Sequence, residues 1–233
     1  MPDAGSSGDW SRVLFGELGG VSEACLAIGQ APVAGGGEAE PCGKKPRQRL
    51  GSAAIMGRVF SLKMNDAAAD MLGVLHGLAA IEPPGGLSPG LRERAAQGIV
   101  RRGKVLTWVS SVGGAAGAPS FFKDLTAWEC SDTSFHLEDV VPVDVATVDD
   151  APVISEDDQR ILVLHGVAFA LEFSRLVYAL DPPSPVRCIL GTNETNATFR
   201  FHQIRPGESW NMPDLDSYRL DKMITIDIEP ADP

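Results

Sequence analysis

Two groups of side chains have the types and spacing that general acid/base catalysis requires. His165, Glu172 and Arg175 follow one another at intervals of seven and three residues, which places them on one face of a helix. Such a trio could be an acid/base pair with shifted pKa values, or a buried polar network that ties the helix to a sheet. His202 and Glu208 are a second possible acid and base. The residue types alone leave the catalytic and the structural interpretation open.

Two apparent enzyme motifs lack a residue that their chemistry needs. Gly86–Gly90 fits G-x-S-x-G, but the residue after the serine must donate its backbone N–H to an oxyanion, and Pro89 has none. Gly98–Lys104 fits the start of a phosphate-binding loop, but Val105 replaces the Ser or Thr that would hold magnesium. We therefore predict no catalytic residue in either stretch, and a helix-entry turn at Ser88.

The residue types that most often bind metals are scattered along the chain. No two of the four histidines are four residues apart, and no two of the four cysteines form a Cys-x-x-Cys pair. We therefore expect no metal, no cofactor and reduced thiols. The first ten residues, MPDAGSSGDW, lack the basic and then apolar pattern of a secretory signal. The sequence thus predicts a cytoplasmic protein that does not enter a membrane.

Negative charge is concentrated in one segment. Between Asp124 and Gln159 there are eleven acidic residues and neither lysine nor arginine, and this segment accounts for the formal charge of −11. A negative surface argues against nucleic-acid binding and favours a basic protein partner, although a solvated loop that maintains solubility has the same composition. The carboxylates that we expect to contact such a partner are Glu138, Asp139, Asp149 and Asp150.

A second set of acids follows an aromatic strand near the C-terminus. Phe199–Ile204 alternates as a strand does, and Pro206–Gly207 should turn the chain onto an acidic loop. Trp210 on this loop is either a plug at the end of the sheet or an anchor that binds a basic surface. The residues assigned to this second surface are Glu208, Trp210, Asp214 and Asp216.

A long apolar helix at about residues 155–180 should position much of the molecule. Ser155 can cap it, the acids in its first turn favour the positive end of the helix dipole, and Asp181–Pro183 ends it. A helix that is apolar on nearly every side is either a membrane span or the core of a domain. The three ionisable residues of the first group favour the core, because each would cost about 2.5 to 3.5 kcal/mol at membrane depth.

The remaining periodicity predicts an α+β fold, with a mostly antiparallel sheet packed on the central helix and with further helices. We expect strands at 55–64, 104–112, 140–148, 186–190, 197–204 and 223–228, and helices at 65–80 and 91–102. A helix at 10–28 and a basic loop at 31–51 precede these elements. The small residues at 113–120 could separate an N-terminal half, 1–112, from a C-terminal half, 113–233, but we expect one compact domain.

The C-terminal residues resemble a known group of proteins. The runs FRFHQIRPGESW, PDLDSY and MITIDIEP are similar to the end of bacterial immunity proteins that neutralise nuclease effectors of polymorphic or type VI secretion toxin systems. The resemblance covers about the last 50 residues, and it carries over no established toxin-contact residue. It implies a cytoplasmic, non-catalytic α+β protein that binds and blocks one cognate toxin.

Three functions are therefore open. The first is an immunity-type inhibitor that binds a basic toxin, because nuclease domains present basic, phosphate-binding surfaces that an acidic protein can occupy. The second is an enzyme that uses His165 with Glu172, or His202 with Glu208, in a pocket. The third is an assembly or scaffold subunit, which a large exposed apolar patch would indicate. The sequence does not identify the partner or the oligomeric state.

Overall fold

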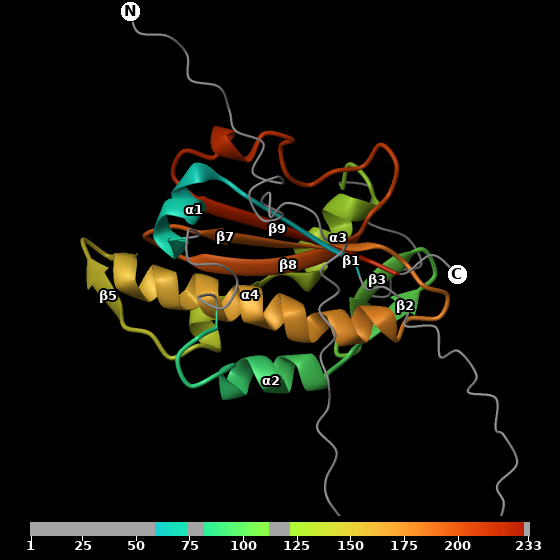
Figure 1. Cartoon of the computed structure of the whole chain (residues 1–233), viewed down its shortest axis with the longest axis horizontal. Coiled ribbons are helices and arrows are strands. Elements are labelled where there is room, and N and C mark those ends of the chain that lie inside the picture. The colour runs from blue at the N-terminus through green and yellow to red at the C-terminus, as the bar shows by residue number, and fades with distance from the viewer. Residues whose placement is uncertain (1–58, 74–81, 112–121, 231–233) are drawn as a thin grey trace, which may run out of the picture.

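A five-stranded antiparallel sheet forms the centre of the protein. The computed structural model describes residues 59–73, 82–111 and 122–230, so the expected helix at 10–28 and the segments 31–51 and 113–120 lie outside these residues. The strands are arranged in the order β1-β9-β7-β8-β4 (Figure 1). Their bounds are β1 Val59–Met64, β4 Phe135–His136, β7 Val186–Thr192, β8 Ala197–Gln203 and β9 Lys222–Glu229.

The predicted central helix is confirmed as α4, Glu156–Tyr178, which packs along one face of the sheet. Ser155 caps it, since the Ser155 hydroxyl accepts the Asp158 backbone N–H at 3.2 Å. A Cβ atom at Gly166 would lie 2.1 Å from Leu190 of β7, so the glycine permits the close approach of helix and sheet. By length and composition α4 could cross a membrane, but 61% of its apolar 18-residue stretch is buried inside the protein.

Aromatic rings fill the space between α4 and the sheet. Phe169 and Phe173 from the helix meet Phe199 and Phe201 from β8, with ring centroids 4.8 Å apart for Phe169 and Phe199 and 4.7 Å apart for Phe173 and Phe201. Trp108 joins them, 5.0 Å from Phe201. The same buried core contains side chains from residues 64–108 and from residues 135–228, so the described parts of both halves share it.

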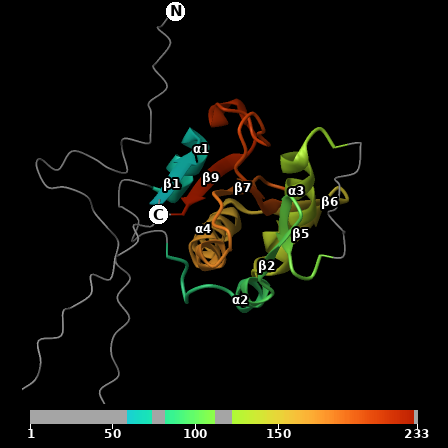
Figure 2. The ribbon, with the colours of Figure 1, turned by 90° about the vertical axis from the view of Figure 1, so that its right-hand side faces the viewer.

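Shorter elements cover the rest of α4 and the sheet. In Figure 2, α4 is seen nearly end-on, with the sheet on one side of it and α2 on the other. The opposite face of the sheet, called the outer face below, is covered in part by α3 and by the loop 205–221. The elements are α1 Asp66–Leu72, α2 Pro89–Ala96, α3 Leu125–Thr133 and the short 3₁₀ helices η4 Leu137–Asp139 and η5 Leu215–Ser217.

Glycines lie where two described helices end. The helix that begins after the cap Asn65 ends at Leu72, where Gly73 adopts a left-handed φ of 61°, and residues 74–80 of the expected helix lie outside the described residues. The basic helix expected at 91–102 ends at Ala96. Gly98, with a φ of 73°, then reverses the chain into a strand. That strand, β2 (Ile99–Arg102), pairs with β3 (Val105–Trp108).

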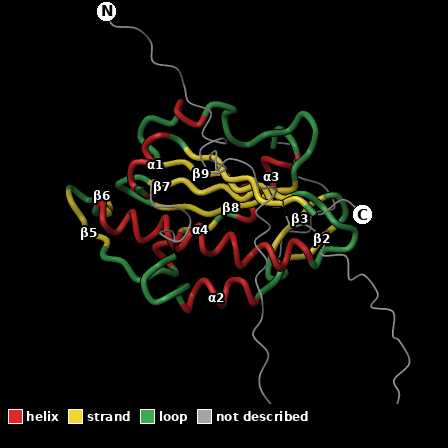
Figure 3. Tube along the Cα trace, viewed as in Figure 1, coloured by secondary structure: helices red, strands yellow, loops and turns green. Residues whose placement is uncertain are grey.

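The strand expected at 140–148 is wrong at its start and incomplete. Residues 140–144 are irregular, and the strand β5 covers only Val145–Val148. It forms a hairpin with β6, Ala151–Ile154, which the sequence did not predict. The class is nevertheless the predicted α+β, with an antiparallel sheet on one long apolar helix and shorter helices around it (Figure 3).

Candidate partner-binding surface

The β5–β6 hairpin carries two of the predicted contact residues at its tip. Val148 pairs with Ala151, so Asp149 and Asp150 form a two-residue turn, with φ angles of 49° and 62°. Left-handed φ at both positions is typical of a type I′ turn, and aspartate tolerates it better than most side chains do. The hairpin extends past the N-terminal end of α4 (Figure 3). Both aspartates are exposed.

Further carboxylates surround this hairpin. Glu156 and Asp157 are exposed in the first turn of α4, and Asp144 is exposed just before β5. Asp139, Asp144, Asp149, Asp150, Glu156 and Asp157 form a set that we call the acidic end. Within the part of the chain that the structure describes, no Lys, Arg or His nitrogen lies within 4 Å of these six carboxylates. Their charge is therefore directed at solvent.

Glu138, the fourth acid predicted in this segment, has partners inside the protein. One carboxylate oxygen accepts the backbone N–H of Ala197 at 3.0 Å, and the other lies 3.1 Å from His136 Nδ1. Its side chain is 14% exposed. Glu138 therefore joins η4 to the start of β8, and its contact with a partner stays a prediction.

Glu208 also has an internal role. Its carboxylate accepts the backbone N–H of Thr126 at 3.0 Å, where it caps the N-terminus of α3, and it lies 3.9 Å from Arg205. The pKa of Arg205 is raised: burial acts to lower it, but the hydrogen bonds and the charge of Glu129 outweigh the burial. Glu208 therefore holds the start of α3 and borders the Arg205–Glu129 ion pair, and its contact with a partner stays a prediction.

Trp210 lies on the outer side of the sheet, against Arg200 of β8. It is 41% exposed, and its ring stacks on the guanidinium of Arg200, with Cζ 5.1 Å from the ring centroid. Burial lowers the pKa of Arg200. The indole is thus not fully buried as a plug. It covers one cation of its own chain, and its role as an anchor stays a prediction.

Asp214 and Asp216 stabilise the loop that carries Trp210. Asp214 accepts the N–H of Asp216 at 3.1 Å and caps η5, and Asp216 accepts the N–H of Asp66 at 2.8 Å, at the start of α1. Both remain exposed. The eight residues predicted as one set of contacts are therefore divided between the acidic end with η4 and the outer-face loop.

The two predicted acid/base pairs are not assembled. His165 is buried, its Nδ1 accepts the N–H of Ser88 at 3.3 Å, and burial lowers its pKa. Glu172 pairs instead with Arg175 at 3.0 Å, about 10 Å along the helix axis from His165. In the second pair, His202 bonds to the carbonyl of Gln203, while its buried Nε2 has no hydrogen-bond partner.

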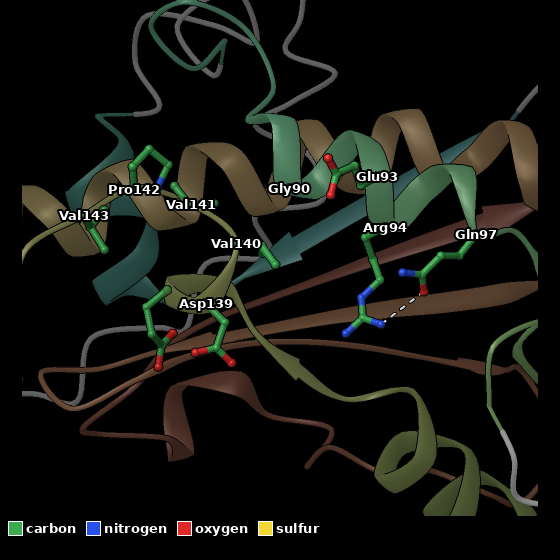
Figure 4. A pocket seen from close by; sticks show the side chains of 10 residues that line it. Gly90, Glu93, Arg94, Gln97, Asp139, Val140, Val141, Pro142 and Val143 are labelled. Atoms are coloured by element: carbon green, nitrogen blue, oxygen red, sulfur yellow. Dashed lines mark hydrogen bonds between the residues drawn. The ribbon is translucent and has the colours of Figure 1, made fainter.

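A groove of about 630 Å³ lies between α2 and residues 138–143 (Figure 4). Arg94 projects into it from α2 and donates to Gln97 at 3.2 Å, and its guanidinium lies 4.7 Å from the centroid of Phe135. Asp139 lines the other wall. The residues that line this groove include no histidine, serine, threonine or cysteine. It could take a charged side chain of a partner. No sequence motif marks this groove, because its two walls are far apart in the chain.

The two described cysteines do not offer a reactive thiol. Cys130 and Cys188 are buried and free, and burial raises the pKa of each. Cys25 and Cys42 lie outside the described residues. In the part of the chain that the structure describes, no group of three or more His, Cys, Asp or Glu side chains has the arrangement of a metal site.

Residues 116–231 match the family model of the Uncharacterized protein PM0498 family. The match covers almost half of the chain and includes the β5–β6 hairpin, α4 and the last three strands. The description of the family assigns no activity. No curated protein and no solved structure matches the chain.

Proposed function

We propose that this chain is a non-catalytic acidic protein that binds and blocks a basic protein, with a nuclease-like toxin as the class of partner. It acts as an immunity-type inhibitor in the cytoplasm and binds neither nucleic acid nor a membrane. The observation that carries this proposal is the acidic end: six exposed carboxylates that have no cation of the described chain within 4 Å. The resemblance of the last strands to immunity proteins supports the same class.

The energetics of such a surface fit a blocker. Uncompensated carboxylates repel one another and contribute nothing to folding, but they attract a basic partner at long range and accelerate encounter. A nuclease presents cations that normally bind phosphate, and an acidic protein can occupy them in place of the substrate. The groove beside Asp139 would add a concave contact at the edge of the same surface.

The first experiment is co-expression with the adjacent open reading frame. The expected result is that the neighbour arrests growth when it is expressed alone and that this chain restores growth. Purified together, the two proteins should associate with an affinity that falls as salt rises. A neighbour that is harmless alone, or one that does not bind this chain, would remove the basis of the proposal.

Charge variants locate the contact. Replacing Asp149 and Asp150 together by asparagine removes two charges and keeps side chains that tolerate the left-handed turn. We expect association at low salt to slow by about 10-fold, with a smaller change in the dissociation rate. The matched control is Glu229→Gln. Glu229 is an exposed carboxylate at the last position of β9, the opposite end of that strand from Lys222, which pairs with Thr192 next to the β7–β8 turn that contacts β6. It should change the association rate by less than about 2-fold.

A further inference from the structure

The two edges of the β5–β6 hairpin differ in what they offer to a partner. The pairs Val148–Ala151 and Ala146–Val153 flank the two-residue turn in the register of hydrogen-bonded pairs. The backbone groups of the intervening residues therefore point away from the hairpin. On β5 these residues are Val145 and Thr147.

The outer edge of β6 is closed. Pro152 has no N–H to offer, and Ile154 donates its N–H to the carbonyl of Glu194 at 2.7 Å, in the turn between β7 and β8. Proline and a covering loop are two devices by which proteins prevent a strand from pairing with another chain. The hairpin uses both on this side.

The outer edge of β5 has neither protection. Val145 and Thr147 are exposed, Val145 by 44%, and within the described residues no hydrogen bond to another element satisfies their outward N–H and C=O groups. Val148, on the other face of the strand, is 53% exposed. An apolar strand with an unpaired edge is a template for an added strand.

Charge determines which strand can be added. Asp144 stands immediately before β5, and Asp149 and Asp150 stand immediately after it, so an added strand would meet carboxylates at both ends. A second copy of this chain, paired antiparallel along β5, would bring Asp144 of one copy close to the Asp149 turn of the other. Like charges opposed across paired strands are destabilising. A strand that bears Lys or Arg gains from the same carboxylates.

We propose that the outer edge of β5 accepts an extended, Lys- or Arg-bearing segment of a partner protein as an added β-strand. The backbone groups of Val145 and Thr147 hydrogen-bond to it, and the carboxylates at the two ends of β5 pair with its cations. This inference rests on the proposed function, in that the partner is the basic protein which the chain blocks. It adds the mode of binding and the residues that contact the partner's backbone.

A proline substitution tests the edge. Thr147→Pro removes the outward N–H while leaving the bonds between β5 and β6 in place, because Thr147 faces Pro152 at a position that does not use that N–H in the hairpin. We expect its affinity for the neighbouring gene product to fall at least 10-fold. Thr147→Val keeps the N–H and is the matched control. It should change the affinity by less than about 2-fold, and so should Pro152→Thr on the closed edge. Equal binding by Thr147→Pro and the wild type would overturn the inference while leaving the proposed function intact.

Hydrogen exchange and peptide binding test strand pairing at β5 independently of the affinities. Hydrogen exchange of the complex should slow at the amides of Val145 and Thr147, and unchanged exchange there would overturn the inference even if the affinities differ. In the absence of a binding neighbour, the probe is a synthetic peptide of alternating lysine and valine, with a glutamate–valine peptide as control. Shifts of the β5 amide signals with the lysine peptide alone support edge pairing. Equal effects of both peptides, no effect of either, or a wild-type dimer that Thr147→Pro dissociates would contradict it.

Discussion

The described residues include two hairpins with two-residue turns, β2–β3 and β5–β6, and their surroundings are opposite. All four residues of β3 are buried, whereas all four residues of β5 are exposed. The backbone N–H of Leu106 in β3 is satisfied by the carboxylate of Glu129 at 2.6 Å, and Trp108 donates its indole N–H to the carbonyl of Thr133 at 3.1 Å. No such cover lies over β5 among the described residues. One hairpin is part of the core, and the other is available for binding.

The same difference separates the carboxylates of the acidic segment. Those at its start serve the fold, as Asp132 does by accepting hydrogen bonds from Thr107 and Ser111. Those at its end, in the acidic end, have no ion pair within the described chain. A buried carboxylate must be paired because its desolvation is costly, whereas an exposed one has no such requirement and is free for a partner.

The largest effect is expected from breaking the buried side of this comparison. Glu129 is fully buried. Its carboxylate accepts a hydrogen bond from the backbone N–H of Gln203 at 2.8 Å and one from each terminal nitrogen of Arg205, at 2.8 and 2.6 Å. Glu129→Gln removes the carboxylate that is hydrogen-bonded to this largely buried guanidinium and leaves it the longer pair with Glu208 at 3.9 Å, so we expect the free energy of unfolding to fall by about 3 to 5 kcal/mol. Urea denaturation measures it. Asp149→Asn at the hairpin tip should stay within about 0.5 kcal/mol, and similar losses in both variants would refute the distinction.

A smaller change in stability should follow from a change in pH, and it should arise at the buried residue His165. Burial lowers the pKa of His165 from its usual 6.5. Near pH 6.5 and just below it, the unfolded chain therefore binds more protons at this residue than the folded chain does. Stability should therefore decrease as pH falls from 6.5 toward the lower pKa of the folded state. In His165→Gln, the decrease between pH 7.5 and 5.5, measured by urea denaturation at each pH, should be reduced. An identical pH dependence in the wild type and the variant would show that His165 does not contribute.

The turn of the buried β2–β3 hairpin should contribute to global stability. Gly103 in the β2–β3 turn has a φ of 62°, and Gly103→Ala should cost about 1 kcal/mol of global stability because alanine is strained there and the hairpin is part of the core. Thermal and urea unfolding measure the change. Lys104→Ala, at the neighbouring exposed position, is the control and should change stability by less than about 0.5 kcal/mol. A cost below about 0.5 kcal/mol for Gly103→Ala would mean that the conformation of the β2–β3 turn does not contribute to global stability.

Periodicity in the sequence was sufficient for the centre of the fold. The cap at Ser155 and the apolar residues after it predicted α4, and alternating residues predicted β7, β8 and β9 within a few positions. These elements have strong local signals because each buries most of its side chains. The strand β2 was not predicted: residues 99–102 were assigned to the preceding helix because they continue its spacing, and only the left-handed Gly98 interrupts it.

The candidate site was only partly predictable. The concentration of acids was visible in the sequence, but the partners of Glu138 and Glu208 are the backbone N–H groups of Ala197 and Thr126, and only the folded chain brings these together. The β5–β6 hairpin was missed because Asp149–Asp150 is not one of the glycine-containing pairs that normally mark a type I′ turn. The exposed edge of β5 follows from pairing register, which composition does not reveal.

The smallest effect on stability is expected at this unusual turn. Asp150 has a φ of 62°, where glycine is favoured, so Asp150→Gly should stabilise the hairpin locally. Because β5 is exposed, global stability should change by less than about 0.5 kcal/mol. Exchange of the Ala146 and Val153 amides, which bond across the hairpin, should nevertheless slow by about 3- to 5-fold if the relief is near 1 kcal/mol.

Asp150→Asn separates this backbone effect from the loss of charge. It removes the same carboxylate without supplying a glycine, so the difference in partner affinity between Asp150→Gly and Asp150→Asn reports the order of the hairpin alone. If a partner strand pairs with β5, the glycine variant should bind more tightly than the asparagine variant, because less freedom is lost on binding. Equal affinity of the two variants, together with slower exchange in the glycine variant, would show that the order of β5 does not matter for binding and that the partner recognises only charge.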